Sequence, residues 1–173
     1  MDDFVPFAGP TWFVLLGLLL FARGMDFLST WVATPHLTLE GNPIAKWLGW
    51  KWGLVVNLGL CVGFATMPIP AIIIATTSLL VAARNFQSAW LMRSLGEDAY
   101  RDWYVDRVRA TRLPLYLFCL AGNTLLTAGV GGGLIYFAAQ AVPQAIGIGI
   151  VGYAVAVAFY TLLSVWRTRR SFR

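Results

Sequence analysis

Asp26 is an acidic residue inside a long apolar segment, one helical turn after the basic residue Arg23. On insertion scales, a charged side chain at the centre of a membrane-spanning helix costs about 2.5–3.5 kcal/mol. Such residues usually face the protein interior and mark a functional site. Thr30 and Thr34 follow at intervals of four residues, so all four side chains lie on one helix face. We therefore predict a polar site on this face.

A second acidic residue lies in the first polar loop, in the sequence Glu40-Gly41-Asn42-Pro43. Asn42 before Pro43 is typical of a turn or a helix start, with Asn42 as the N-cap. The loop is apolar enough to re-enter the membrane, which is tolerated where backbone lines a protein cavity. We expect Glu40 to lie near Asp26 at the mouth of such a cavity.

Other apolar segments carry polar residues at a similar depth, as judged from the rise of about 1.5 Å per helical residue. Arg84 and Asn85 are adjacent in one of them, and Asn57 and Asn123 lie in two others. The opposite halves of these segments are much more apolar, which predicts a polar cavity open to one side. The predicted ligand-binding residues are Arg23, Asp26, Thr30, Glu40, Asn42, Arg84 and Asn85.

These residue types are compatible with several kinds of chemistry. The carboxylates of Asp26 and Glu40, with the amide oxygen of Asn42, form a metal-ligand set suited to Mg²⁺, Ca²⁺ or Mn²⁺. The same carboxylates could act as an acid–base pair or carry protons, and Arg23 and Arg84 could bind a phosphate or carboxylate. The competing interpretation is structural: Asp26 neutralises an arginine, and the ion pair holds helices together.

The composition determines the fold class. The chain has 173 residues, of which 58% are hydrophobic and 12% charged, and its mean hydropathy is +0.69. A membrane-spanning helix needs about 20 apolar residues, and the chain contains several such segments. We predict an all-α, polytopic membrane helical bundle that forms a single integral membrane domain over residues 1–173. The five predicted spans are Thr11–Thr34, Lys51–Met67, Pro70–Met92, Leu113–Gln140 and Gln144–Trp166.

The distribution of basic residues predicts the orientation. If the arginine-rich segment 167–173 is cytoplasmic, five spans place every loop that contains Lys or Arg on the same side. This positive-inside pattern predicts an N-out/C-in protein of the bacterial inner (cytoplasmic) membrane, with anionic lipid at its cytoplasmic face. Topology explains the arginines, so we expect no nucleic acid partner. Between the third and fourth spans, residues 97–112 carry aromatic residues at helical spacing, which predicts a cytoplasmic interfacial helix.

Two spans contain glycines four residues apart, Gly59 with Gly63 and Gly129 with Gly133. Small residues at this spacing let membrane helices approach closely. We expect these glycine-rich faces to serve packing within the chain, and the alternative is a homo-oligomer.

The pattern around Asp26 resembles an uncharacterised family of small bacterial integral membrane proteins. Their signature is an Asp and a Thr in the first helix, E-x-N-P in the next loop, and a Lys near the following helix. The matching residues are Asp26, Thr30, Glu40-Gly41-Asn42-Pro43 and Lys51, within residues 20–65. The resemblance implies that these residues act together, and it implies no activity.

Three functions remain open at this point. The leading hypothesis is a cytoplasm-facing site within the membrane that binds or transports a cation, a small polar ligand or a lipid head group. The first alternative is an intramembrane enzyme, dependent on a metal or on the carboxylates, that acts on a lipid-linked substrate. The second alternative is a structural subunit of a membrane complex.

Overall fold

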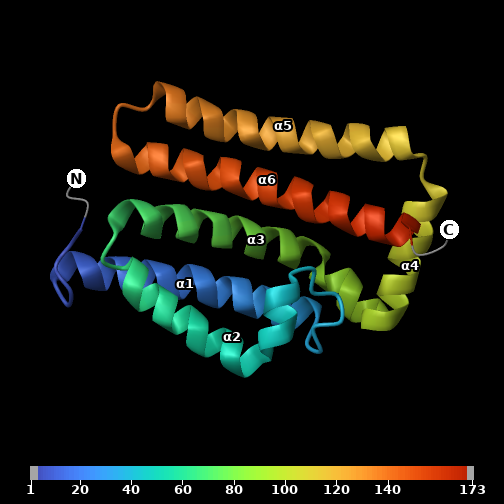
Figure 1. The fold of residues 1–173 in the computed structure, drawn as a ribbon, viewed down its shortest axis with the longest axis horizontal. Coiled ribbons are helices and arrows are strands. Elements are labelled where there is room, and N and C mark those ends of the chain that lie inside the picture. The colour runs from blue at the N-terminus through green and yellow to red at the C-terminus, as the bar shows by residue number, and fades with distance from the viewer. Residues whose placement is uncertain (1–3, 171–173) are drawn as a thin grey trace.

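The structure is a computed structural model that describes residues 4–170, and within that range it contains six α-helices and no strands. The predicted all-α class is thus confirmed (Figure 1). The helices are α1 (Pro10–Ala33), α2 (Pro43–Phe64), α3 (Pro68–Leu95), α4 (Glu97–Ala110), α5 (Leu113–Phe137) and α6 (Ala141–Arg170).

Four of these helices, α1, α3, α5 and α6, are long and apolar enough to cross a membrane, as expected of an integral membrane protein. The second predicted span, which falls in α2, is not among them. Gly49 interrupts α2 with a φ of 63°, a conformation that glycine adopts without steric cost. From there to Phe64 the helix is only about 22 Å long at 1.5 Å per residue, against about 30 Å for the hydrocarbon core of a bilayer.

Local sequence explains where several helices begin. Proline lies in the first turn of α1, α2, α3 and α5, where its missing N–H costs no hydrogen bond. Asn42 caps α2 as predicted, because its side-chain Oδ1 accepts a hydrogen bond from the Ile44 N–H at 3.0 Å. Gly96, with a φ of 83°, turns the chain between α3 and α4. The helix expected over residues 97–112 is observed as α4, and its position at the membrane interface stays a prediction.

The long helices lie side by side in the order α5, α6, α3, α1 (Figure 1). Helix α2 runs obliquely beside α1 and touches α1 and α3 only lightly, and α4 crosses the end at which α3 and α6 finish. Arg169 of α6 secures α4 by donating hydrogen bonds to the carbonyl oxygens of Val108 and Thr111. The four long helices therefore form a row, and α2 lies beside this row with little contact to its neighbours.

One hydrogen bond at each end of this row joins segments that are distant in the sequence. At one end the Val5 N–H donates to the Thr66 carbonyl at 2.9 Å, so α1 and α3 begin together. At the other end the Trp50 indole donates to the Pro35 carbonyl at 2.9 Å.

Charged residues are unevenly distributed between these two ends. Within residues 4–170, every Asp, Glu, Lys and Arg lies at the second end except Arg23, Asp26 and Arg84.

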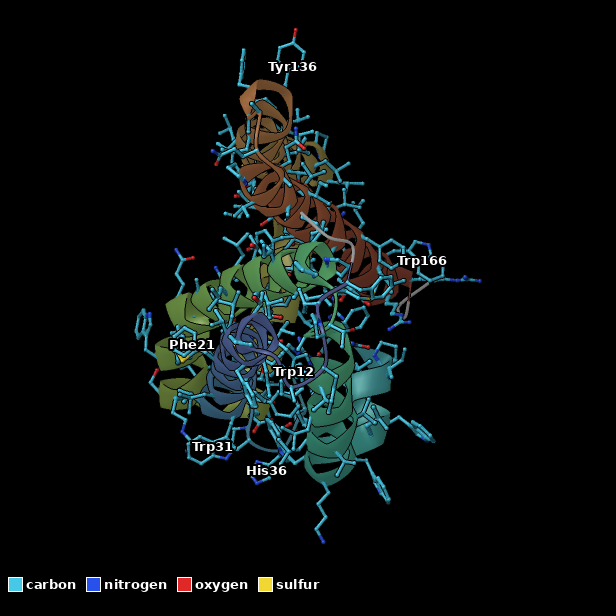
Figure 2. The ribbon with its side chains drawn as sticks, turned by 90° about the vertical axis from the view of Figure 1, so that its left-hand side faces the viewer. Trp12, Phe21, Trp31, His36, Tyr136 and Trp166 are labelled. Atoms are coloured by element: carbon cyan, nitrogen blue, oxygen red, sulfur yellow. The ribbon has the colours of Figure 1, made fainter. Side chains whose placement is uncertain are left out.

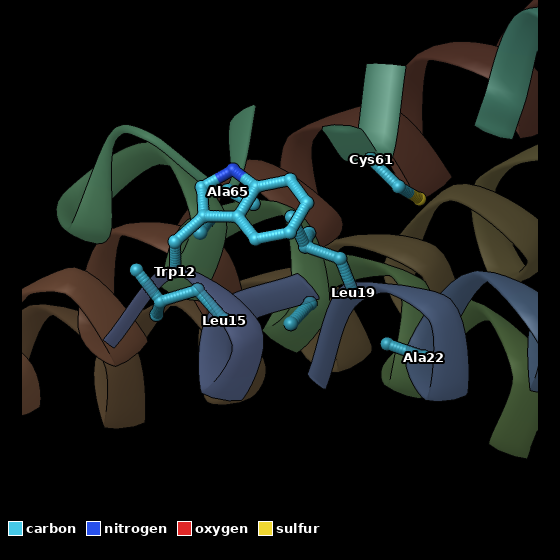
Figure 3. Close-up of a cluster of buried hydrophobic side chains, with 8 residues drawn as sticks. Trp12, Leu15, Leu19, Ala22, Cys61 and Ala65 are labelled. Atoms are coloured by element: carbon cyan, nitrogen blue, oxygen red, sulfur yellow. The ribbon is translucent and has the colours of Figure 1, made fainter. Parts of the chain in front are cut away.

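The buried core lies between α1, α3 and the last part of α2. Trp12 points inward, whereas Trp31 on the same helix lies at the outer surface (Figure 2). Figure 3 shows the Trp12 indole beside Ala65, with Leu15 and Leu19 on the same face of α1. This cluster is apolar and holds the first three helices together at the end that lacks charges.

Glycines bring α5, α6 and α3 into close contact, but not at the predicted positions. A Cβ on Gly131 would lie 2.7 Å from the Gly147 carbonyl oxygen, and one on Gly149 would lie 2.8 Å from the Thr76 Cβ. By contrast, a Cβ on any of Gly59, Gly63, Gly129 or Gly133 would meet nothing within 4 Å. The expectation that these two pairs pack inside the chain was therefore wrong, because α5 turns Gly131 toward α6. The homo-oligomer stays a prediction.

Candidate binding site around Arg23

Arg23 is the centre of a hydrogen-bonded cluster that joins three helices. Its Nη1 donates to Asp26 Oδ2 at 2.8 Å and to Ser78 Oγ of α3 at 3.1 Å. Its Nε donates to Asn57 Oδ1 of α2 at 2.7 Å, and Nη2 donates to the same oxygen. One guanidinium therefore connects α1, α2 and α3 at the level where α2 diverges from the other two.

The cluster is largely shielded from its surroundings. The side chains of Arg23 and Asp26 are 29% and 17% exposed, and Ser78 is buried. The Nδ2 of Asn57 donates to the Gly53 carbonyl at 2.7 Å, which directs the amide oxygen toward Arg23. A buried ion pair is tolerated when further hydrogen bonds compensate for lost hydration, and these neutral partners meet that requirement.

Asn85 extends the cluster by one turn of α1. Its Nδ2 lies 3.3 Å from both Ser29 Oγ and Thr30 Oγ1. Ser29 is fully buried and donates to the Asp26 carbonyl oxygen at 2.9 Å. Arg23, Asp26, Thr30 and Asn85 are thus brought together, as the sequence predicts. The candidate set missed Ser29, Ser78 and Asn57. Of these three, only Asn57 could be noticed in the sequence, because it is an amide in an apolar segment at a depth in the membrane similar to that of Asp26.

Glu40 and Asn42 form a local turn. The Asn42 N–H donates to Glu40 Oε1 at 2.7 Å, and the Asn42 side chain is occupied as the cap of α2. Glu40 lies within electrostatic range of Asp26, but no hydrogen bond links the two in the described residues. Residues 4–170 also contain no group of three or more His, Cys, Asp or Glu placed to hold a metal ion. The predicted metal site at Asp26, Glu40 and Asn42 therefore has no support.

Arg84 and Thr34 lie elsewhere. The Arg84 side chain is exposed, and the group it acts on electrostatically is Tyr104 of α4. Within residues 4–170 it forms no hydrogen bond or ion pair with the Arg23 cluster. Thr34 shares a face with Asp26 as expected, but its hydroxyl donates to Glu97 Oε2 at 2.7 Å. Thr34 therefore connects the end of α1 to α4, and Arg84 lies within electrostatic range of α4.

A crevice of about 250 Å³ opens beside Arg23 between α1, α2 and α3. It extends from Arg23 toward the end without charges, because its other wall residues lie on that side. On the opposite side, Phe27 and Trp50 pack edge to face at 6.0 Å between ring centroids. The sequence predicts a polar cavity on the charged side, whereas this crevice is mostly apolar and on the other side. Its walls are Leu19, Arg23, Asn57, Leu60, Cys61, Phe64 and Ile74.

Glu97, the first residue of α4, holds the loop that follows α1. Its carboxylate accepts hydrogen bonds from the backbone N–H groups of His36 and Thr38 at 2.9 and 3.0 Å, and from the Thr34 hydroxyl. The Nδ1 atom of His36 also lies 3.1 Å from Glu97. Desolvation alone would raise the pKa of Glu97, but these donors stabilise the ionised form and lower the pKa to about 2.

Comparison with protein-family models, curated proteins and solved structures finds no match for this chain. The resemblance to the family with the E-x-N-P signature accordingly stays a prediction. The structural features that bear on function are the Arg23 cluster, the crevice beside it and the charged end of the molecule.

Proposed function

We propose that the chain crosses the bacterial inner membrane five times, with α2 as the short second crossing and the charged end in the cytoplasm. Helices α1 and α3 are parallel and begin together, so the chain between them must return across the same layer. The bonds Trp50–Pro35 and Val5–Thr66 tie α2 to opposite ends of α1. The positive-inside rule assigns the arginine-rich end to the cytoplasm, which supports the N-out/C-in orientation.

We further propose that the protein binds an amphiphilic ligand of the lipid class in the crevice beside Arg23. The observation that carries this proposal is the composition of the crevice wall. Five of the seven wall residues are apolar, and the two polar ones, Arg23 and Asn57, are neighbours at one end. An apolar chain along Leu60 and Phe64 with its polar group at Arg23 satisfies both parts of the wall.

The hydrogen bonds of Arg23 leave capacity for a ligand. A guanidinium has five N–H groups, and within the described residues four hydrogen bonds use them. The remaining N–H group can donate to a carboxylate, phosphate or carbonyl oxygen. A cation fits less well, because Asp26 already pairs with Arg23. Among the ligands that the sequence allows, a lipid with a hydrogen-bond-accepting head group therefore fits best.

The test uses two substitutions on α2 that differ only in their position relative to the crevice. Leu60 lines it and Leu58 does not, yet the two side chains are similarly exposed, at 49% and 45%. We expect Leu60→Trp to fill the crevice and to reduce crosslinking by a photoactivatable fatty acid several-fold. Leu58→Trp should leave crosslinking unchanged. Equal crosslinking in the wild type and both variants would contradict lipid binding at this site.

The two cysteines provide a second readout on the unmodified chain. Cys61 lies in the crevice wall, whereas Cys119 is exposed on α5. Alkylation by N-ethylmaleimide, followed by mass spectrometry, should be slower at Cys61 when fatty acid is added, and unaffected at Cys119. If lipid protects both cysteines equally, the protection comes from the detergent–lipid micelle and the assignment to the crevice fails. Transport would require, in addition, movement of the ligand across proteoliposomes.

A further inference from the structure

A second, separate cleft of about 370 Å³ lies at the charged end of the molecule. The loop after α1 forms one side, and the junction of α3 with α4 forms the other. It is about 15 Å along α1 from Arg23, judged by the helical rise to Ala33, and it shares no wall residue with the crevice. Its walls include Pro35, His36, Thr38, Arg93, Glu97 and Asp98.

The shape of this cleft is preformed. Glu97 binds the loop through two backbone N–H groups and the Thr34 hydroxyl, and its side chain is only 11% exposed. The Trp50–Pro35 hydrogen bond holds the same loop from the α2 side. A ligand would thus meet an ordered wall, so little binding free energy would be lost in ordering the loop.

The cleft presents both signs of charge. Arg93 supplies a guanidinium, which lies 5.9 Å from the ring centroid of Trp31. Asp98 supplies a carboxylate that is 81% exposed and only loosely paired with Arg101, at 3.6 Å. The carboxylate of Glu97 is already occupied by the loop. The groups free to bind a ligand are therefore one cation and one anion, both in the wall of the same cleft.

The position of the cleft favours a lipid over a soluble ligand. Trp31 and Trp90 lie within the last two turns of α1 and α3 and are 50% and 70% exposed, and Trp31 points outward (Figure 2). Exposed tryptophans at helix ends are typical of the membrane–water interface, at the level of lipid head groups. Arg93 and Asp98 are thus at the depth where a phosphate and its substituent lie.

We propose that this cleft binds the head group of a phospholipid that carries both a phosphate and a primary ammonium group. The phosphate pairs with Arg93, and the ammonium donates to Asp98. A purely anionic head group would pair with Arg93 but would leave the Asp98 carboxylate without a cationic partner in the ligand. A choline head group has no N–H to donate to Asp98. This proposal does not depend on ligand binding at Arg23.

The chain offers a matched control for the test. Asp98 and Asp102 both pair with Arg101, at 3.6 and 3.5 Å, and both are highly exposed, but only Asp98 lines the cleft. Purified full-length protein in detergent would be titrated with phosphatidylethanolamine, phosphatidylglycerol and phosphatidylcholine of identical acyl chains. Bound lipid would be counted by native mass spectrometry.

We expect the wild type to bind phosphatidylethanolamine about tenfold more tightly than the other two lipids, the effect of one charge-assisted hydrogen bond. Asp98→Asn and Arg93→Gln should each remove this preference, and Asp102→Asn should keep it. Absence of the preference in the wild type would overturn the proposal, as would equal effects of Asp98→Asn and Asp102→Asn. Displacement of the lipid by an equal concentration of soluble phosphoethanolamine would overturn the assignment to a lipid.

Discussion

The α5–α6 hairpin and the unit formed by α1, α2 and α3 are held together by different kinds of contact. In the α5–α6 hairpin the two backbones are in contact. A Cβ atom on either Gly131 or Gly147 would clash with the carbonyl oxygen of the other residue. In the α1–α2–α3 unit, α2 lies farther from its neighbours and is connected to them by Arg23, by the Trp12 cluster and by the loop at Trp50.

This difference bears on where a ligand can bind. Close backbone contact between apolar helices leaves little space for a ligand, so the hairpin is suited to packing. The three-helix unit contains a crevice, a guanidinium with one N–H group that forms no hydrogen bond within residues 4–170, and a cleft at its charged end. Both proposed ligand sites therefore lie in this unit and at its junction with α4, and neither lies in the α5–α6 hairpin.

The largest effect that distinguishes these two parts should come from a single methyl group in the hairpin. A Cβ on Gly147 would lie 2.6 Å from the Gly131 carbonyl oxygen, so Gly147→Ala must separate the two helices. We expect a loss of about 3 kcal/mol in the free energy of unfolding, at the upper end of the range for overpacking. Unfolding in mixed detergent micelles would measure it.

Gly152→Ala on the same helix is the control, because a Cβ there meets nothing within 4 Å. It should be neutral or stabilise the protein by up to about 1 kcal/mol, since alanine is the better helix former. If both substitutions had the same effect, the proposed contrast between a tight hairpin and an open three-helix unit would be wrong.

A smaller effect is expected at the polar cluster of the three-helix unit. Asp26→Asn leaves Arg23 without its counter-charge but retains its bonds to Asn57 and Ser78. Breaking a buried ion pair costs about 3–5 kcal/mol. Because both side chains are partly exposed, we expect about 2 kcal/mol. Alkylation of Cys61 should also become faster as α2 loosens.

Asp106→Asn, an exposed acidic position on α4, should change neither the stability nor the alkylation rate. If Asp26→Asn destabilised the protein without changing alkylation of Cys61, the cluster would hold α1 against α3 only. The role assigned to Arg23 in placing α2 would then be lost.

The features that the sequence predicted correctly depend on local spacing. The interval between Arg23 and Asp26 places them on one helix face wherever that helix packs, and Asn42 before Pro43 caps α2 through contacts within two residues. The four long apolar helices follow from composition. None of these features depends on how the helices are rotated against one another.

The features that were missed depend on helix rotation and on distant partners. Gly129, Gly131 and Gly133 are nearly adjacent, and only the orientation of α5 decides that Gly131 faces α6. The hydrogen bond between Thr34 and Glu97 joins residues 63 positions apart. The interruption of α2 at Gly49 appears only in its backbone conformation. The spacing of apolar and polar residues along the chain does not report helix rotation, distant hydrogen-bond partners or local backbone conformation.

The smallest expected effect concerns the link between the three-helix unit and α4. Donors from the loop lower the pKa of Glu97 to about 2, below the ordinary value near 4.3. The folded state therefore binds the proton less readily than the unfolded state. The resulting stability is complete above about pH 4.5 and is lost as the pH falls toward 2. Glu97→Gln should cost about 1 kcal/mol at pH 7.

The measurement is the difference in unfolding free energy between the wild type and Glu97→Gln, followed from pH 7 to as low a pH as the detergent permits. This difference should shrink below about pH 4.5, because protonated glutamate and glutamine are both poor acceptors for several donors at once. Asp98→Asn, at the next residue and exposed, should show little difference at any pH. A difference for Glu97→Gln that stayed constant with pH would mean that packing of the side chain, rather than its charge, holds the loop to α4.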